Sequence, residues 1–104
     1  MALNNGLIKY IDTEILHLLC KEFNFVGLDM FKVLLKYLNL DIIKDTRTNM
    51  YLKNATSLDA LLYYDADIKI IELFIEHGAI MNNEYLLNKL SQDKRKRIES
   101  LLEY

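Results

Sequence analysis

Residues 70–82 read IIELFIEHGAIMN and hold the clearest structural signal in this chain. Apolar residues recur there at spacings of three and four, which is the pattern of an amphipathic helix. Gly78 stands where a helix often needs a residue in the left-handed conformation, and a small residue and a second apolar residue follow it at once. The segment therefore predicts a helix that ends at Gly78 in a sharp turn.

A preceding helix is predicted from residues 56–61, which read TSLDAL. Thr56 or Ser57 can cap this helix through a hydroxyl group, because the first backbone N–H groups of a helix have no partner inside it. Together, the two helices resemble an ankyrin repeat, whose first helix begins Thr-Pro-Leu-His-x-Ala and whose second ends in a Gly-Ala turn. Two positions depart from that pattern, since Ser57 replaces the Pro and Asp59 replaces the His. The resemblance implies a stack of helix pairs that binds another protein.

An earlier copy of this unit lies in residues 12–43. Residues 15–19, ILHLL, parallel residues 57–61, and His17 stands at the position of Asp59. Residues 33–37 parallel residues 73–77, and the two offsets are 42 and 40 positions. Because an ankyrin period is about 33 residues, the repeat must contain an insertion, which falls in the polar segment 44–55.

Two further short amphipathic stretches, residues 84–90 and 97–102, predict a closing pair of helices, with Ser91 or Asp93 as a cap. A terminal helix with a charged outer face keeps the end of a repeat stack soluble. We therefore expect an all-α, ankyrin-like helix-turn-helix repeat stack in a single domain over residues 1–104. Its expected parts are a first repeat-like unit (12–43), an insertion loop (44–55), a second repeat-like unit (56–82) and C-terminal capping helices (83–104).

Composition agrees with one helical domain. The 104 residues are 52% hydrophobic and 27% charged, with no Pro and only three Gly, which disfavours disorder and turn-rich β folds. Asp12 and Glu14 interrupt the first apolar stretch, so no signal peptide is predicted, and no run is long enough for a membrane span. With Cys20 as the single cysteine, we expect a cytoplasmic or nuclear protein in a reducing compartment.

No enzyme chemistry is predicted. His17 and Cys20 are three positions apart on one helix and could begin a Cys–His nucleophile or half a zinc site. A zinc site needs four ligands, however, and the only other histidine is His77. We expect a buried structural Cys20 and a His17 that bonds neighbouring backbone, with no metal and no cofactor. The alternative, a Cys20-dependent enzyme, predicts a lowered thiol pKa.

The seven tyrosines, with no tryptophan, indicate a recognition surface. Tyr combines apolar area with a hydroxyl group and few rotatable bonds, and it is enriched at interfaces. In the ankyrin-like arrangement, four of them would border the concave recognition face: Tyr51, Tyr63, Tyr64 and Tyr85. The alternative for any of these rings is that it fills the core between helices.

The most basic segment is the run Lys94, Arg95, Lys96 and Arg97, a candidate contact patch for phosphate. Because the whole chain has a net charge near −2, a solvated terminal helix is the favoured interpretation of this run. Nucleic-acid binding is the minor alternative, and its affinity would fall steeply with salt.

The bias toward Leu, Ile, Asn, Lys and Tyr is typical of AT-rich coding sequences. Divergent ankyrin repeats with insertions and missing prolines are similar to those of poxvirus immune-evasion proteins and of effectors from intracellular bacteria. This resemblance implies a virulence-type module that captures a host protein of immune signalling or ubiquitin pathways, in the host cell. The main alternative is a self-associating helical bundle that forms a homodimer.

Overall fold

The computed structural model describes residues 10–102, and this part of the chain is all-α, as predicted. The remaining residues of the predicted domain, 1–9 and 103–104, lie outside the described part. The helices, in chain order, are α2 (Thr13–Lys21), α3 (Phe23–Tyr37), α4 (Leu40–Lys44), α5 (Ser57–Tyr63), α6 (Ile68–Glu76), the 3₁₀ helix η1 (Glu84–Lys89) and α7 (Gln92–Leu102). None of these helices is both long and apolar enough to cross a membrane.

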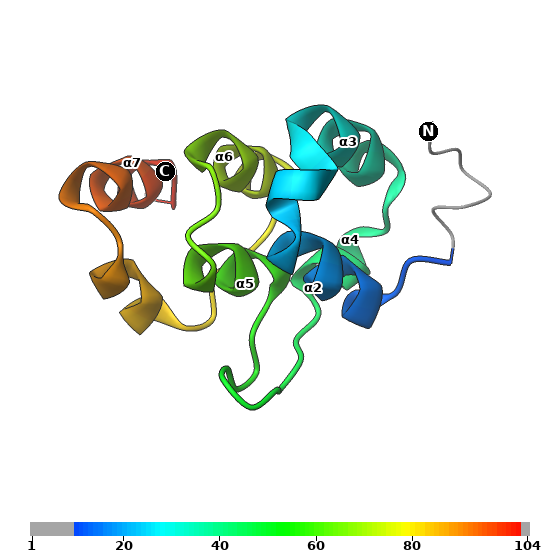
Figure 1. The fold of residues 1–104 in the computed structure, drawn as a ribbon, viewed down its shortest axis with the longest axis horizontal. Coiled ribbons are helices and arrows are strands. Elements are labelled where there is room, and N and C mark those ends of the chain that lie inside the picture. Colours follow the sequence, from blue (N-terminus) through cyan, green and yellow to red (C-terminus); the bar gives the residue numbers. More distant parts are fainter. Residues whose placement is uncertain (1–9, 103–104) are drawn as a thin grey trace.

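The helices form two rows (Figure 1). One row contains α2, α5 and η1, and the other contains α3, α6 and α7. Within the rows, α2 packs on α5, α5 on η1, α3 on α6 and α6 on α7. Three helix pairs, α2–α3, α5–α6 and η1–α7, therefore follow one another in chain order, and we call the row with α2 and α5 the inner row.

The outer dimensions are 39 × 27 × 26 Å and the radius of gyration is 12.9 Å. A compact domain of this length has a radius of gyration of about 13 Å. A stack of only three short pairs is thus nearly as compact as a bundle, so shape alone does not separate these two arrangements.

The core lies between the rows and joins one helix pair to the next. Leu16 of α2 and Leu58 of α5, which occupy parallel positions in the two repeat-like segments, are both fully buried. In the other row, the rings of Phe31 and Phe74 meet edge to face with centroids 5.3 Å apart. Such an aromatic pair adds about 0.5–1.5 kcal/mol beyond the burial of its area.

The predicted helix end at Gly78 is confirmed. Gly78 has φ +91°, its N–H donates to the carbonyl of Ile75 at 3.0 Å, and the N–H of Ala79 donates to that of Phe74 at 2.9 Å. These two bonds satisfy carbonyl groups that the helix itself leaves unpaired. A side chain at Gly78 would also meet Leu40 of α4, because a Cβ there would lie 3.0 Å from Leu40 Cδ1.

The segment predicted as an insertion loop folds back on itself. Lys44 ends α4, and the backbones of Arg47 and Ala55 then exchange two hydrogen bonds of 2.9 and 2.8 Å. Leu52 and Ala55 are buried, so the returning arm packs against the domain. We call residues 45–56 the hairpin, which projects below the inner row in Figure 1.

Two neighbouring hydroxyl groups, of Thr56 and Ser57, fix the start of α5. Thr56 is the N-cap, as predicted, and its Oγ1 accepts from the N–H of Asp59 at 3.2 Å. The same hydroxyl donates to the carbonyl of Ile80 at 2.6 Å, and the Ser57 hydroxyl donates to the carbonyl of Ile43 at 2.8 Å. These two neighbouring residues therefore tie α5 to the segment after α6 and to the end of α4.

The Asp59 carboxylate makes the densest set of contacts in the described part of the chain. Its side chain is fully buried. It accepts from the backbone N–H of Thr56 at 3.0 Å, of Asn82 at 3.0 Å and of Asn83 at 3.2 Å, and from the Asn83 side-chain amide at 3.0 Å. Asp59, which replaces the His of the ankyrin pattern, thus joins α5 to the segment that leads into the third helix pair.

The third helix pair begins irregularly. No side chain caps η1, and the side-chain NH2 group of the preceding Asn83 donates instead to Asp59 and to the carbonyl of Lys53. η1 is a 3₁₀ helix, a form that is tighter than an α-helix and common in short pieces. Ser91 caps α7 as predicted, since its Oγ accepts from the N–H of Lys94 at 3.3 Å.

We predict that Asp59→Asn lowers the free energy of unfolding by about 2–3 kcal/mol, because an amide leaves buried N–H donors without an acceptor. Urea denaturation followed by circular dichroism measures this loss. The control is Asp29→Asn on the exposed side of α3, which should change stability by less than about 0.5 kcal/mol. Equal effects of the two substitutions would contradict the role given to Asp59.

Candidate functional site

Three of the four predicted recognition tyrosines lie together on the inner row. The rings of Tyr51, from the hairpin, and Tyr63, from the end of α5, stack with centroids 6.0 Å apart. Tyr64 meets Tyr63 edge to face at 5.0 Å, and Lys89 Nζ lies 5.0 Å from the centre of the Tyr63 ring. Tyr51 is 62% exposed, whereas Tyr63 also packs against the core. We call Tyr51, Tyr63 and Tyr64 the tyrosine cluster.

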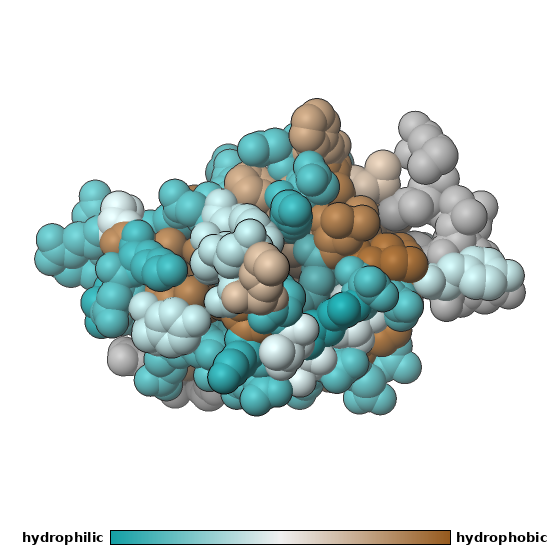
Figure 2. Space-filling model, turned by 60° about the horizontal axis from the view of Figure 1, so that its bottom comes forward, coloured by the Kyte–Doolittle hydropathy of each residue, from teal (hydrophilic) through white to brown (hydrophobic). Residues whose placement is uncertain are grey.

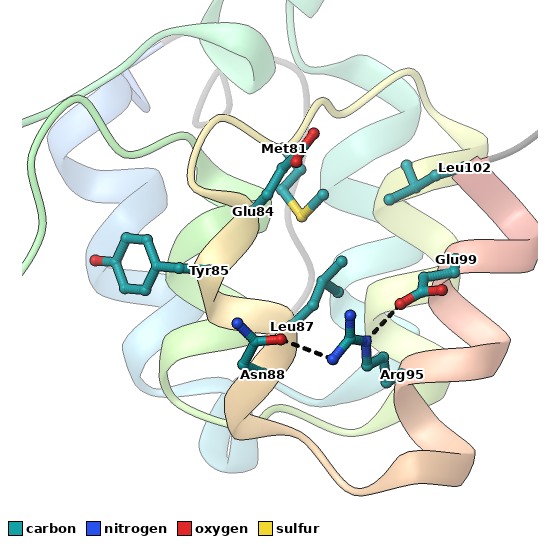
Figure 3. A pocket seen from close by; sticks show the side chains of 8 residues that line it. All are labelled: Met81, Glu84, Tyr85, Leu87, Asn88, Arg95, Glu99 and Leu102. Atoms are coloured by element: carbon teal, nitrogen blue, oxygen red, sulfur yellow. Dashed lines mark hydrogen bonds and ion pairs between the residues drawn. The ribbon is translucent and has the colours of Figure 1, made fainter.

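Tyr85 stands apart from this cluster. It is 49% exposed, and no ring contact joins it to the other three tyrosines, all of which the structure describes. It lines a pocket between η1 and α7, where its ring extends away from α7 (Figure 3). The predicted recognition residues therefore form one group of three and one separate residue.

The basic run lies on α7, and three of its four cations contact other parts of the chain. Two of them hold α7 in place: Arg97 pairs with Glu72 of α6 at 3.1 Å, and Lys94 pairs with Asp65 at 2.7 Å. Lys94 also donates to the carbonyl of Ala66. Such contacts give this run a structural role in the last helix pair.

Arg95 makes the third set of contacts. It reaches from α7 toward η1, where it donates to Asn88 at 2.7 Å, and it also pairs with Glu99 (Figure 3). The remaining cation, Lys96, is exposed. Phosphate binding by the run stays a prediction, and it would require these cations to exchange partners.

A groove that the sequence does not reveal runs between α2 and the hairpin. Residues of α2, the hairpin and the end of α5 line it: Glu14, His17, Leu18, Lys21, Arg47, Asn49, Met50, Tyr51, Leu52, Ala60 and Tyr64. Figure 2 turns this face forward and shows hydrophobic residues gathered over α2, beside the mostly hydrophilic hairpin. Two members of the tyrosine cluster, Tyr51 and Tyr64, thus also line the groove.

Charge is unevenly distributed along the groove. Glu14, in the first turn of α2, pairs with Arg47 of the hairpin at 3.2 Å. Lys21, in the last turn of α2, has no ion pair within the described residues. The groove therefore has a neutralised end at Glu14 and a positive end at Lys21.

His17 does not make the predicted bond to neighbouring backbone through Nε2. That atom is buried and has no hydrogen-bond partner within the described part of the chain. Burial, and then the nearby Arg47 guanidinium, lower the pKa of His17, while Asp45 and Asp59 oppose this effect. His17 and Asp59 stand at parallel positions, but only the carboxylate gains the network of donors described above.

Cys20 is fully buried, as predicted. Burial raises the pKa of its thiol, which is the opposite of the lowered pKa that a cysteine nucleophile needs. Within residues 10–102, no group of three or more His, Cys, Asp or Glu side chains is arranged to hold a metal ion.

Comparisons with known proteins give no match: no family model matches the chain, and neither a curated protein nor a solved structure is significantly similar to it. The surface chemistry of the molecule is therefore the basis for any functional conclusion.

We predict that the free energy of unfolding falls as the pH drops from about 7 to 5, in part through His17. Its pKa is lowered in the folded state, so as the pH falls through about 6.5 the unfolded chain binds a proton before the folded chain does. His17→Gln should flatten the pH dependence in this range, and His77→Gln is the control. Chemical denaturation at a series of pH values measures the slope.

A separate loss is expected at lower pH. The Thr13 hydroxyl, which donates to Asp45 at 2.6 Å, lowers the pKa of that carboxyl. The contribution of the ionised Asp45 carboxylate to the free energy of unfolding is present above about pH 4 and disappears as the pH falls through the lowered pKa.

If His17→Gln left the slope between pH 7 and 5 unchanged, the lowered pKa of His17 would not be the cause of the loss of stability in that range.

Proposed function

We propose that this chain is a non-catalytic protein-interaction module built as an ankyrin-like stack of helix pairs. The order of packing supports the stack, because each helix pair contacts the next pair along the chain. The parallel buried positions Leu16 and Leu58 support it as well. In this proposal, α2–α3 and α5–α6 are the two repeats, and η1–α7 closes the stack.

The tyrosine cluster is the observation that carries the functional proposal. Its rings come from two separate elements, the hairpin and the end of α5, and they remain partly or largely exposed while contacting one another. Such a preorganised aromatic surface suits binding, because its side chains lose little conformational freedom when a partner covers them. Interface hot spots are enriched in Tyr, and truncation of one costs about 2 kcal/mol or more.

The resemblance to host-directed ankyrin proteins supports a partner from a host cell, in immune signalling or ubiquitin pathways. That resemblance bears on the source of the partner, whereas the tyrosine cluster bears on the surface that binds it.

We predict that a Tyr51→Ala, Tyr64→Ala double variant loses its partner. The measurement is affinity capture from mammalian-cell lysate with quantitative mass spectrometry, using wild type and variants that circular dichroism shows to be folded. A matched control is Tyr37→Ala on α3, because Tyr37 is exposed like Tyr51 and lies outside the tyrosine cluster. A protein retained by wild type and by the control should be reduced at least about tenfold with the double variant.

Two results would contradict the proposal. Retention of the same protein by the double variant would remove the tyrosine cluster as the binding surface. If wild type retained only copies of itself, a self-associating bundle would be the better account.

A further inference from the structure

We infer that the groove between α2 and the hairpin receives a partner-protein segment in which a large apolar side chain is flanked by acidic residues. This inference rests on the proposed function and adds the chemistry of the partner to it.

The middle of the groove is apolar on both sides. Leu18 of α2 is 55% exposed and Met50 of the hairpin is 85% exposed, and Leu52 and Ala60, both buried, contribute to the lining between them. One exposed apolar side chain is ordinary on a protein surface, but apolar side chains that line one groove from separate elements form a patch. A large apolar side chain of the partner would remove this patch from water, and Tyr51 would border it.

The positive end of the groove supplies the charge complementarity. Glu14 is already paired with Arg47, whereas Lys21, about two helical turns further along the same side of α2, is exposed and unpaired within residues 10–102. Lys89 does not line the groove, but it lies over Tyr63, whose ring stacks on the groove residue Tyr51, so a second cation stands beside the tyrosine cluster. The positive surplus is local, since the whole chain has a net charge of −2. Carboxylates of a partner segment would find Lys21 in the groove and Lys89 beside the tyrosine cluster.

The surroundings favour a peptide over a nucleic acid. Bases bind single-strand platforms by stacking on open aromatic faces, but the Tyr63 ring is already covered by Tyr51 and Lys89. Leu18 and Met50 offer apolar volume and no stacking surface. An apolar side chain with neighbouring carboxylates matches each of these features.

The test begins with selection of binders from a random displayed peptide library, using the full chain. We expect the selected peptides to contain a large apolar residue next to Asp or Glu. Their dissociation constants are then measured for wild type and for two double variants. The groove variant carries Lys21→Glu and Lys89→Glu. The control variant carries Lys32→Glu and Lys69→Glu, which make the same change of net charge elsewhere. Both control positions are exposed, on α3 and α6.

Binding should weaken about tenfold or more for the groove variant and less than about twofold for the control. A selected peptide with its acidic residues changed to Lys should bind the groove variant better than it binds wild type. Leu18→Glu, with folding verified by circular dichroism, should abolish binding of the acidic peptides.

Several results would overturn the inference. These are selection of basic or wholly polar peptides, equal weakening by the control variant, selection of no peptide, or tighter binding of a single-stranded oligothymidine probe at the same groove. None of these results contradicts the proposed function, because capture of a cellular protein through Tyr51 and Tyr64 is measured separately and does not require acidic peptides to bind the groove. If acidic peptides still bound at Lys21 but capture of the cellular protein did not depend on Tyr51 and Tyr64, only the tyrosine cluster would be ruled out as a binding surface.

Discussion

The buried Asp59 carboxylate is the constraint on which the arrangement of helix pairs depends. Burying a carboxylate costs free energy unless hydrogen-bond donors surround it, and here Thr56, Asn82 and Asn83 supply four. Two of these residues lie beyond α6, so the carboxylate is satisfied only when the segment after α6 returns to the start of α5. The same return places the Asn83 side chain against Asp59, and η1 begins without a side-chain cap. One side chain thus fixes the start of α5, the exit from α6 and the entry into the last helix pair.

The sequence predicted the parts of this fold that depend on local patterns. The helix that ends at Gly78, the Thr56 and Ser91 caps and the all-α class follow from spacing and from the chemistry of helix ends, and the structure contains them. Most of the Asp59 network could not be predicted, because three of its four donors, on Asn82 and Asn83, are more than twenty positions away and two of these are backbone groups. His17 was expected to bond neighbouring backbone, but its buried Nε2 has no partner within the described residues, because such a bond depends on the final positions of the surrounding groups.

The candidate site, too, could be predicted only in part from the sequence. Composition and position indicated four tyrosines, but only the folded hairpin brings Tyr51 against Tyr63 and leaves Tyr85 apart. The groove beside the tyrosine cluster had no clear signal in the sequence, because the hairpin looked like a polar insertion without apolar period. The spacing of Glu14, Leu18 and Lys21 on one side of α2 was visible, yet its meaning depends on the hairpin that faces it. The hairpin, predicted from the sequence only as an insertion loop, is therefore the element that faces α2 across the groove.

Native-state hydrogen exchange tests the central claim most directly. The backbone amides of Asn82 and Asn83 lie in a segment without helix or strand, and Asn82 is exposed as a residue, so such amides would ordinarily exchange quickly. If the Asp59 carboxylate holds the helix pairs together, these two amides should exchange nearly as slowly as the core amides of α5, and Asp59→Asn should abolish that protection. Fast exchange of both amides in the wild-type chain would contradict the account.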